Sequence, residues 1–279
     1  MPKTIVFQSD FTYKEGAVAA MYGVVKQVDP ELEIIDLTHE IPKFDIWSAS
    51  FRLHQVVPFW PIGTVFVSVV DPGVGTARKA CVAKTKRGHY IVTPDNKTLT
   101  HIAKFIGIEE VREIPSELRF ASPYKTAVFH GRDVFGYVGA LLASGQKKFE
   151  ELGEVYSDYQ SYVLEEPHID GDALLGIVEI LDPNFGNAWT NIPITWAKQL
   201  GIEYNDLVEV DIYEKERLAL QLIVPYKSTF GGVHVNEAVM YANELECLAL
   251  AINQGSFIHT YHINQGPDWC ICIRKASYV

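Results

Sequence analysis

The chain has 279 residues, of which 48% are apolar and 21% are charged, so it is long and apolar enough for one large globular domain or two ordinary ones. Its formal net charge of −11 argues against nucleic acid or an anionic membrane as a partner, because both are bound through Lys and Arg. No apolar run approaches the ~20 residues of a membrane span, and the N-terminus lacks the pattern of a secretory signal, so we expect a cytoplasmic protein.

The first half of the chain alternates between two patterns. Strand-like apolar stretches cover 3–8, 31–38, 63–70, 80–85 and 89–95. Apolar residues at helical spacing cover 15–28, 98–107 and 133–145. This alternation predicts an α/β domain with a mostly parallel sheet and helices on both faces. In such a sheet, ligands bind at the carboxyl ends of the strands.

The second half has a different pattern. An acidic, irregular segment around 150–172 is followed by the strand-like stretches LLGIVEIL, DLVEVDIYEKERLALQLIV, LECLALAIN and DWCICIRK, with few helical periods. We therefore predict an N-terminal α/β domain over 1–160 and a smaller antiparallel, barrel-like β domain over 173–279.

The stretch VVDPGVGTARKA, 69–80, places polar groups at the end of an apolar strand. It is not the dinucleotide-binding pattern G-x-G-x-x-G, since Arg78 stands where the third glycine belongs. A turn explains Pro72 and the glycines, but it does not explain Asp71 at the strand end and Arg78 just beyond. Both could act on a ligand at the sheet edge.

Three further stretches carry candidate residues. In FHGRDVFG, 129–136, His130 precedes a predicted helix that Asp133 could cap. In LDPNFGNAWTNI, 181–192, Asn187 beside aromatic residues suits a purine, although a turn also explains Asp-Pro-Asn. Asp10 ends the first strand, where a carboxylate can accept both hydroxyls of a ribose. The sequence contains no H-E-x-x-H motif, nucleophile elbow or Walker loop, so metal and serine hydrolysis are poorly supported.

Taken together, QSDF, DLTHEIPKFDI, VVDPGVGTAR, TPDN, FHGRDVF and DPNFGNAWTNI resemble the S-adenosyl-L-methionine hydroxide adenosyltransferases, relatives of fluorinase and chlorinase. The resemblance runs from about residue 4 to 258, with the motifs in the same order. It implies the two-domain fold predicted above and a homotrimer, in which each site lies between the N-domain of one subunit and the C-domain of the next.

The resemblance also implies an activity and a set of site residues. S-adenosyl-L-methionine would be hydrolysed by attack of water or hydroxide on the ribose C5′, giving adenosine and L-methionine without a metal or other cofactor. Asp71, Arg78 and His130 match the Asp–Arg–His set beside the attacking water, with His130 free to take or relay a proton. The positions that match the substrate-binding residues are Asp10 and Phe44 (ribose), Asn187, Phe185, Trp189 and Phe230 (adenine), and Asp182 (methionine ammonium).

Two alternatives remain at this point. Halide-using relatives have a Tyr at the position of Asp71 and a halide-holding Ser at that of Gly131, so this chain favours water over a halide. A non-catalytic adenosine or S-adenosylmethionine sensor would keep Asp10 and Asn187 for binding. One departure concerns the amino-acid tail, because Glu244 stands where relatives place a Ser that contacts the methionine carboxylate, and a Glu there would repel it.

Overall fold

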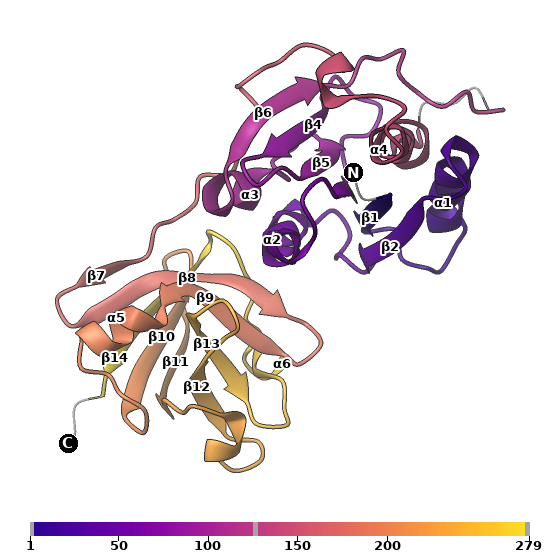
Figure 1. Ribbon diagram of the computed structural model, residues 1–279. Helices are drawn as coiled ribbons and strands as arrows, with labels where there is room; N and C mark the ends of the chain where they lie inside the picture. The colour runs from indigo at the N-terminus through magenta and orange to yellow at the C-terminus, as the bar shows by residue number, and fades with distance from the viewer. Residues whose placement is uncertain (1–2, 125–127, 277–279) are drawn as a thin grey trace. The chain divides into compact units, whose positions relative to one another are not determined.

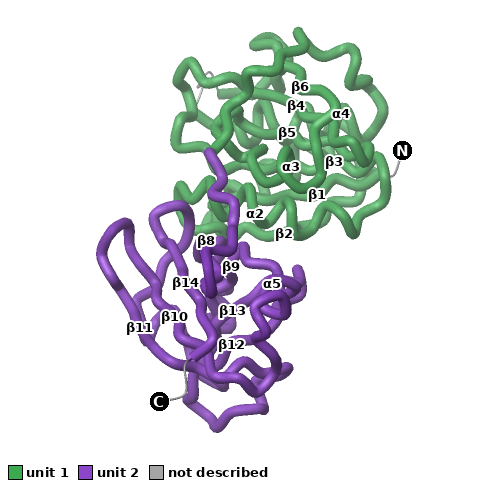
Figure 2. Tube along the Cα trace, turned by 90° about the vertical axis from the view of Figure 1, so that its left-hand side faces the viewer, with its two compact units in different colours: residues 1–162 green, residues 163–279 purple. Residues whose placement is uncertain are grey.

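The computed structural model describes residues 3–124 and 128–276. The chain divides into two compact units, residues 1–162 and 163–279, which are coloured separately in Figure 2. Among the described residues, no helix has both the length and the apolar character needed to cross a bilayer.

The first unit is built on a six-stranded sheet with the order β2-β1-β3-β5-β4-β6. β1, β2, β3 and β5 pair in parallel, whereas β4 runs antiparallel to both of its neighbours. The strands are β1 (Thr4–Ser9), β2 (Glu33–Thr38), β3 (Val65–Val69), β4 (Ala80–Thr85), β5 (Tyr90–Pro94) and β6 (Ile108–Glu113). The helices are α1 (Ala17–Val28), α2 (Ile46–Val56), η1 (Val57–Phe59), α3 (Thr100–Phe105), the π-helix η2 (Gly131–Gly136), α4 (Tyr137–Ala143) and η3 (Phe149–Glu151).

Helices cover both faces of this sheet, as Figure 1 shows. Ile5 and Phe7 of β1 pack in one core cluster with residues of α1 and α4, whereas Val6 between them packs in another with residues of α2 and α3. Successive side chains of a strand point to opposite faces, so a strand that is apolar throughout can support both clusters. The predicted mostly parallel α/β arrangement is confirmed.

The second unit is a curled antiparallel sheet with the order β11-β10-β14-β8-β9-β13-β12, and β7 pairs with β8 (Figure 1). The first half of the long strand β8 pairs with β14 and its second half with β9, so β8 belongs to both sides of the curled sheet. The strands are β7 (His168–Asp170), β8 (Ala173–Asp182), β9 (Asn187–Pro193), β10 (Leu207–Glu214), β11 (Arg217–Pro225), β12 (Ala238–Ala242), β13 (Cys247–Ile252) and β14 (Trp269–Lys275). The helices are α5 (Ile194–Gln199), η4 (Phe230–Gly232) and α6 (Phe257–Tyr261). The predicted antiparallel, barrel-like character is confirmed as a half-barrel.

The acidic segment around 150–172 crosses the boundary between the units, and its first part is fixed to the first unit. The buried carboxylate of Asp95 accepts hydrogen bonds from the backbone N–H of Gln160 at 2.8 Å and from the hydroxyl of Tyr156 at 3.2 Å. The backbone N–H of Tyr162 donates to Thr100 Oγ1 at 3.0 Å. These contacts explain why the first unit extends to residue 162.

One local prediction is wrong. Asp133 does not cap a helix, because the helical segment begins earlier, with η2 at Gly131, and no side-chain cap is present there. Asp133 lies in the first turn and is buried. Its carboxylate instead accepts hydrogen bonds from Arg132 Nε at 2.6 Å and Arg132 Nη2 at 3.0 Å. The adjacent guanidinium is a stronger partner for a buried carboxylate than a backbone N–H would be.

Candidate active site

Asp71, Arg78 and His130 meet at the carboxyl end of β3. Asp71 follows β3 after one residue, Arg78 lies two residues before β4, and His130 directly precedes η2. Arg78 Nε donates to Asp71 Oδ1 at 2.8 Å, and Arg78 Nη2 donates to Asp71 Oδ2. Nη2 also lies 2.9 Å from His130 Nδ1. The three side chains from two separate loops therefore form one hydrogen-bonded group.

The loop from Asp71 to Arg78 is shaped by two successive turns. The N–H of Val74 donates to the carbonyl of Asp71 at 3.2 Å, and that of Thr76 donates to the carbonyl of Gly73 at 3.1 Å. Gly75 has a φ of 79°, a conformation that glycine adopts without strain. These turns bring the guanidinium back to the carboxylate seven positions earlier in the sequence.

The hydrogen bonds define the protonation state of His130. A guanidinium only donates hydrogen bonds, so His130 Nδ1 must accept from Arg78, which places the ring proton on Nε2. The pKa of His130 is lowered by burial, and the positive charges of Arg78 and Arg119 lower it further. His130 is consequently a neutral ring with an N–H on the side away from Arg78.

A cavity of about 330 Å³ adjoins this group. Asp71 and His130 line it together with the apolar side chains of Phe11, Val74 and Phe129. Phe11 and Phe129 pack edge to face, with ring centroids 5.8 Å apart. The cavity thus combines the carboxylates of Asp71 and Glu15 and the imidazole of His130 with walls that are otherwise largely apolar.

Asp10 and Phe44 lie close together at the same edge of the sheet. Asp10 follows β1, the parallel neighbour of β3, and its carboxylate accepts a hydrogen bond from the N–H of Phe44 at 2.9 Å. Burial raises the pKa of Asp10, and the negative charge of Asp71 adds to that increase. Phe44 has a φ of 65° and is 68% exposed. A carboxylate and an exposed aromatic ring are thus presented side by side.

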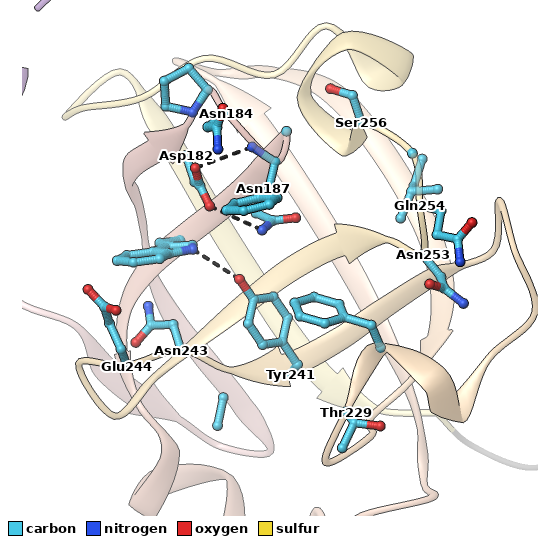
Figure 3. Close-up of a pocket in the computed structure, with 18 of the residues that line it drawn as sticks. Asp182, Asn184, Asn187, Thr229, Tyr241, Asn243, Glu244, Asn253, Gln254 and Ser256 are labelled. Atoms are coloured by element: carbon cyan, nitrogen blue, oxygen red, sulfur yellow. Dashed lines mark hydrogen bonds between the residues drawn. The ribbon is translucent and has the colours of Figure 1, made fainter.

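The five candidate residues of the second unit line a single pocket of about 1110 Å³, shown in Figure 3. Asn187 Nδ2 donates to Asp182 Oδ2 at 3.3 Å, and Trp189 Nε1 donates to the hydroxyl of Tyr241 at 3.0 Å. The rings of Phe230 and Tyr241 lie 4.6 Å apart. The fifth residue, Phe185, is 69% exposed. The pocket therefore offers stacking surfaces beside an amide and a carboxylate.

The turn between β8 and β9 positions Asp182, Phe185 and Asn187 in this pocket. The N–H of Gly186 donates to the carbonyl of Asp182 at 2.8 Å. Gly186 has a φ of 75°, and a Cβ there would lie 2.3 Å from Ser256 Oγ. Only glycine allows this approach between the turn and the segment before α6.

Sequence reasoning missed part of this pocket. Tyr241 and Asn243 line it from β12 and the residues that follow, and β12 was not predicted. Glu244 also lines the pocket, on the same side as Asn243 in Figure 3. Burial raises the pKa of Tyr241 to about 12, and the charges of Asp182 and Glu244 contribute to the increase. The pocket wall thus carries two carboxylates.

Within 3–124 and 128–276, no three His, Cys, Asp or Glu side chains come together as a metal site would require.

Comparison with known proteins agrees with this arrangement. Residues 5–153 match the model of the SAM hydroxide adenosyltransferase N-terminal domain, and residues 176–270 match that of the C-terminal domain. The chain is similar to the (R)-S-adenosyl-L-methionine hydrolase of Thermus thermophilus, with 32% identity over 276 residues that cover 95% of this chain and 97% of that protein. It is also similar to the hydrolase of the same name from Methanocaldococcus jannaschii, with 34% identity over 219 residues, 76% of this chain and 74% of the other.

A fluorinase from an Actinoplanes species is 26% identical over 288 residues, 94% of this chain and 95% of the enzyme. Among solved structures, that of an uncharacterized conserved protein from Thermotoga maritima matches with a TM-score of 0.87 and 34% identity, covering 97% of this chain and all of the other. The matches span both units and nearly the full length of the chain, so this protein belongs to the SAM hydroxide adenosyltransferase family.

Proposed function

We propose that this protein is an S-adenosyl-L-methionine hydrolase that forms adenosine and L-methionine. The observation that carries the proposal is the hydrogen-bonded group of Asp71, Arg78 and His130 on the wall of a small, largely apolar cavity. The names of the relatives from Thermus thermophilus and Methanocaldococcus jannaschii support the same activity.

In the proposed reaction, the oxygen of water attacks the ribose C5′ and the C5′–S bond breaks. The electron pair of that bond passes to sulfur, so methionine leaves as a neutral thioether and one proton of the water is released. As the attacking oxygen loses its proton, the negative charge that grows on it neutralises the positive charge of the sulfonium, and an environment with little water favours that change. The aromatic walls of the cavity supply such an environment.

The geometry indicates a separate role in the reaction for each of the three residues. Each carboxylate oxygen of Asp71 accepts one hydrogen bond from Arg78 and retains a lone pair that can accept from the attacking water. His130 Nδ1 is occupied by Arg78, so His130 can donate its Nε2–H to the nucleophile's oxygen but is poorly placed to take its proton. We therefore assign proton acceptance to Asp71, and stabilisation of the growing oxygen charge to Arg78 and His130.

We further propose that Asp10 binds the ribose hydroxyls beside Phe44 and that Asn187 bonds the adenine edge. Phe185, Trp189 and Phe230 would surround the base, and Asp182 would meet the methionine ammonium. A pocket of about 1110 Å³ is large enough for a nucleoside with its tail. No metal or other cofactor takes part in this proposal.

A homotrimer is also part of the proposal, with the first unit of one chain completing the site on the second unit of the next. The division of site residues between two units supports it. If it is correct, mixing Asp71→Asn with Asn187→Ala chains under conditions that exchange subunits should restore activity, because some sites then combine two intact halves. No recovery despite proven exchange would place each site within one chain.

The activity itself is tested with the separated sulfonium epimers of S-adenosylmethionine in ¹⁸O-labelled water. We expect adenosine that carries the label at its 5′ oxygen. We also expect the R epimer to be the one consumed, because the relatives are named (R)-S-adenosyl-L-methionine hydrolases. Unlabelled adenosine would rule out attack by solvent. A 5′-halo-5′-deoxyadenosine formed in chloride or fluoride would favour the halide reaction, and tight binding without any product would favour a sensor.

The lowered pKa of His130 leads to a testable pH dependence. Protonation of Nδ1 would remove the acceptor that Arg78 uses, so activity should persist above the folded-state pKa and be lost as the pH falls through it. Because that pKa lies below the ordinary value of 6.5, kcat at saturating substrate should be level above pH 6.5 and decline only below it.

The control for this prediction is His130→Asn, whose amide oxygen can replace Nδ1 as the acceptor but does not titrate. The decline in kcat should disappear in this variant. A decline caused by Asp10, whose pKa is raised, would instead be seen in kcat/KM and would remain in His130→Asn. A wild-type inflection at or above pH 6.5 would contradict the assignment of a neutral His130.

A further inference from the structure

A second hydrogen-bonded group lies at the carboxyl ends of β1 and β2 and has no part in the reaction described above. Ser9 Oγ lies 2.6 Å from His39 Nδ1, and His39 Nε2 lies 3.0 Å from Asp36 Oδ1. The two residues Ser9 and His39 are 0% and 1% exposed. Buried polar groups such as those of Ser9 and His39 are stable only if each donor and acceptor has a partner.

The direction of each hydrogen bond in this group follows from its partners. Burial would raise the pKa of Asp36, but hydrogen bonds from Tyr13 and Tyr22 together with His39 lower it, so Asp36 is a carboxylate that only accepts. His39 Nε2 must then carry the ring proton. Burial lowers the pKa of His39, which keeps the ring neutral and leaves Nδ1 as an acceptor for the Ser9 hydroxyl.

With its proton directed at His39, the Ser9 hydroxyl has lone pairs left to accept a hydrogen bond. It accepts from the backbone N–H of Phe11 at 3.2 Å. The order Ser–His–Asp is that of a nucleophilic triad, but Ser9 has no exposed surface at which a substrate could reach its oxygen. The group therefore acts on the backbone rather than on a substrate.

The backbone that it holds is the segment 9–12. Two further hydrogen bonds join this segment to the chain after β2: from the N–H of Ile41 to the carbonyl of Ser9 at 3.3 Å, and from the N–H of Thr12 to the carbonyl of His39 at 2.8 Å. Asp10 accepts from Phe44 in the same region. Asp10 and Phe11 are thus fixed from both sides of the segment.

We propose that Ser9 and His39 are positioning residues that hold Asp10 and Phe11 in the geometry needed for nucleoside binding. The inference rests on the proposed function, in which Asp10 receives the ribose and Phe11 lines the cavity beside Asp71. A site residue keeps its geometry only when a supporting shell of hydrogen bonds holds its backbone, and here Asp36, Tyr13 and Tyr22 complete that shell.

The test is Ser9→Ala, which removes the acceptor for the Phe11 N–H. We expect the Kd for adenosine and the KM for S-adenosylmethionine to rise about tenfold, the value of one lost hydrogen bond, while kcat falls less than about threefold. His39→Ala should behave in the same way. His39→Asn should restore most of the affinity, because its amide oxygen can accept from Ser9 where Nδ1 does.

The first unit offers a matched control in Ser50. Ser50 is also 0% exposed, accepts from the N–H of His101 at 3.0 Å and lies 2.8 Å from His101 Nδ1. Ser50→Ala therefore loses a comparable buried Ser–His contact, and we expect a similar fall in melting temperature but an unchanged Kd for adenosine.

The proposal is overturned if Ser9→Ala binds adenosine as the wild type does, or if Ser50→Ala weakens binding equally. The proposal is also overturned if His39→Asn binds adenosine no better than His39→Ala does. A wild-type protein that binds adenosine but never hydrolyses S-adenosylmethionine would contradict the proposed function alone. The Kd values of the variants for adenosine would still test the role of Ser9 and His39.

Discussion

Replacing Asp71 with asparagine is expected to lower kcat by about 10²–10³-fold while the Kd for adenosine changes little, because one preorganised polar group at the reacting atoms is lost. An amide has one accepting oxygen, so it cannot both hold Arg78 through two bonds and accept from the water. The Arg78 side chain is only 8% exposed and would lose its charged partner. Steady-state kinetics and calorimetry with adenosine measure the two quantities.

The control for Asp71→Asn is a second carboxylate–guanidinium pair in the same unit. Arg132 donates twice to the buried carboxylate of Asp133, at 2.6 and 3.0 Å, so Arg132→Lys also breaks a two-point ion pair. We expect Arg132→Lys to lose stability but to retain most of its kcat. Equal losses of kcat in both variants would mean that Asp71 contributes to folding rather than to the reaction.

Replacing Gly131 with serine is expected to lower kcat at least about tenfold without producing a halogenated nucleoside. A Cβ at this position would lie 3.0 Å from Phe11 Cε2 and 3.2 Å from Phe129 Cε2, so the rings that line the cavity must shift by a few tenths of an ångström, and the expected loss depends on how firmly they are packed. Asp71 would remain to repel a halide. Chromatography of the products in chloride and fluoride, together with kcat, tests both statements.

Two variants make this result interpretable. Gly23→Ser in α1 is the control, since a Cβ there meets nothing within 4 Å, and it should keep full activity. The double variant Phe11→Leu/Gly131→Ser provides space for the new side chain and should recover part of the stability that Gly131→Ser loses. If Gly131→Ser alone turned over normally, Phe11 would not form a rigid wall of the cavity.

Some of these features follow from local sequence and others do not. Five of the six strands of the first unit were predictable, because runs such as residues 5–7 are apolar at every position. α2 was missed although Asp45 caps it by accepting from the N–H of Ser48 at 2.9 Å, because its sequence mixes polar residues into the apolar face. β6, β9 and β12 were also missed. β6 owes its strand conformation to pairing with β4, which lies far from it in the sequence, whereas β9 and β12 owe theirs to hairpin pairing with the predicted strands β8 and β13.

The same distinction applies to the site. Asp71, Arg78 and His130 were candidates because each stands next to a strand or helix pattern at the ligand edge, and the family resemblance grouped them. The contact between Ser9 and His39 joins residues 30 positions apart, and nothing in either local pattern predicts it. Tyr241 is another such case, because its role depends on a hydrogen bond from Trp189, 52 positions away.

The hydrogen bonds that tie Gln160 and Tyr162 to the first unit have a consequence for protein engineering. A chimaera that exchanged one half of this enzyme for the same half of a relative would keep these anchors only if the junction were placed after Tyr162. A junction within the acidic residues 150–160 would place the end of this segment from one protein against the surface around Asp95 from the other. With the junction after Tyr162, each half would keep both its own anchoring contacts and its own site residues, and would be exchangeable as a unit.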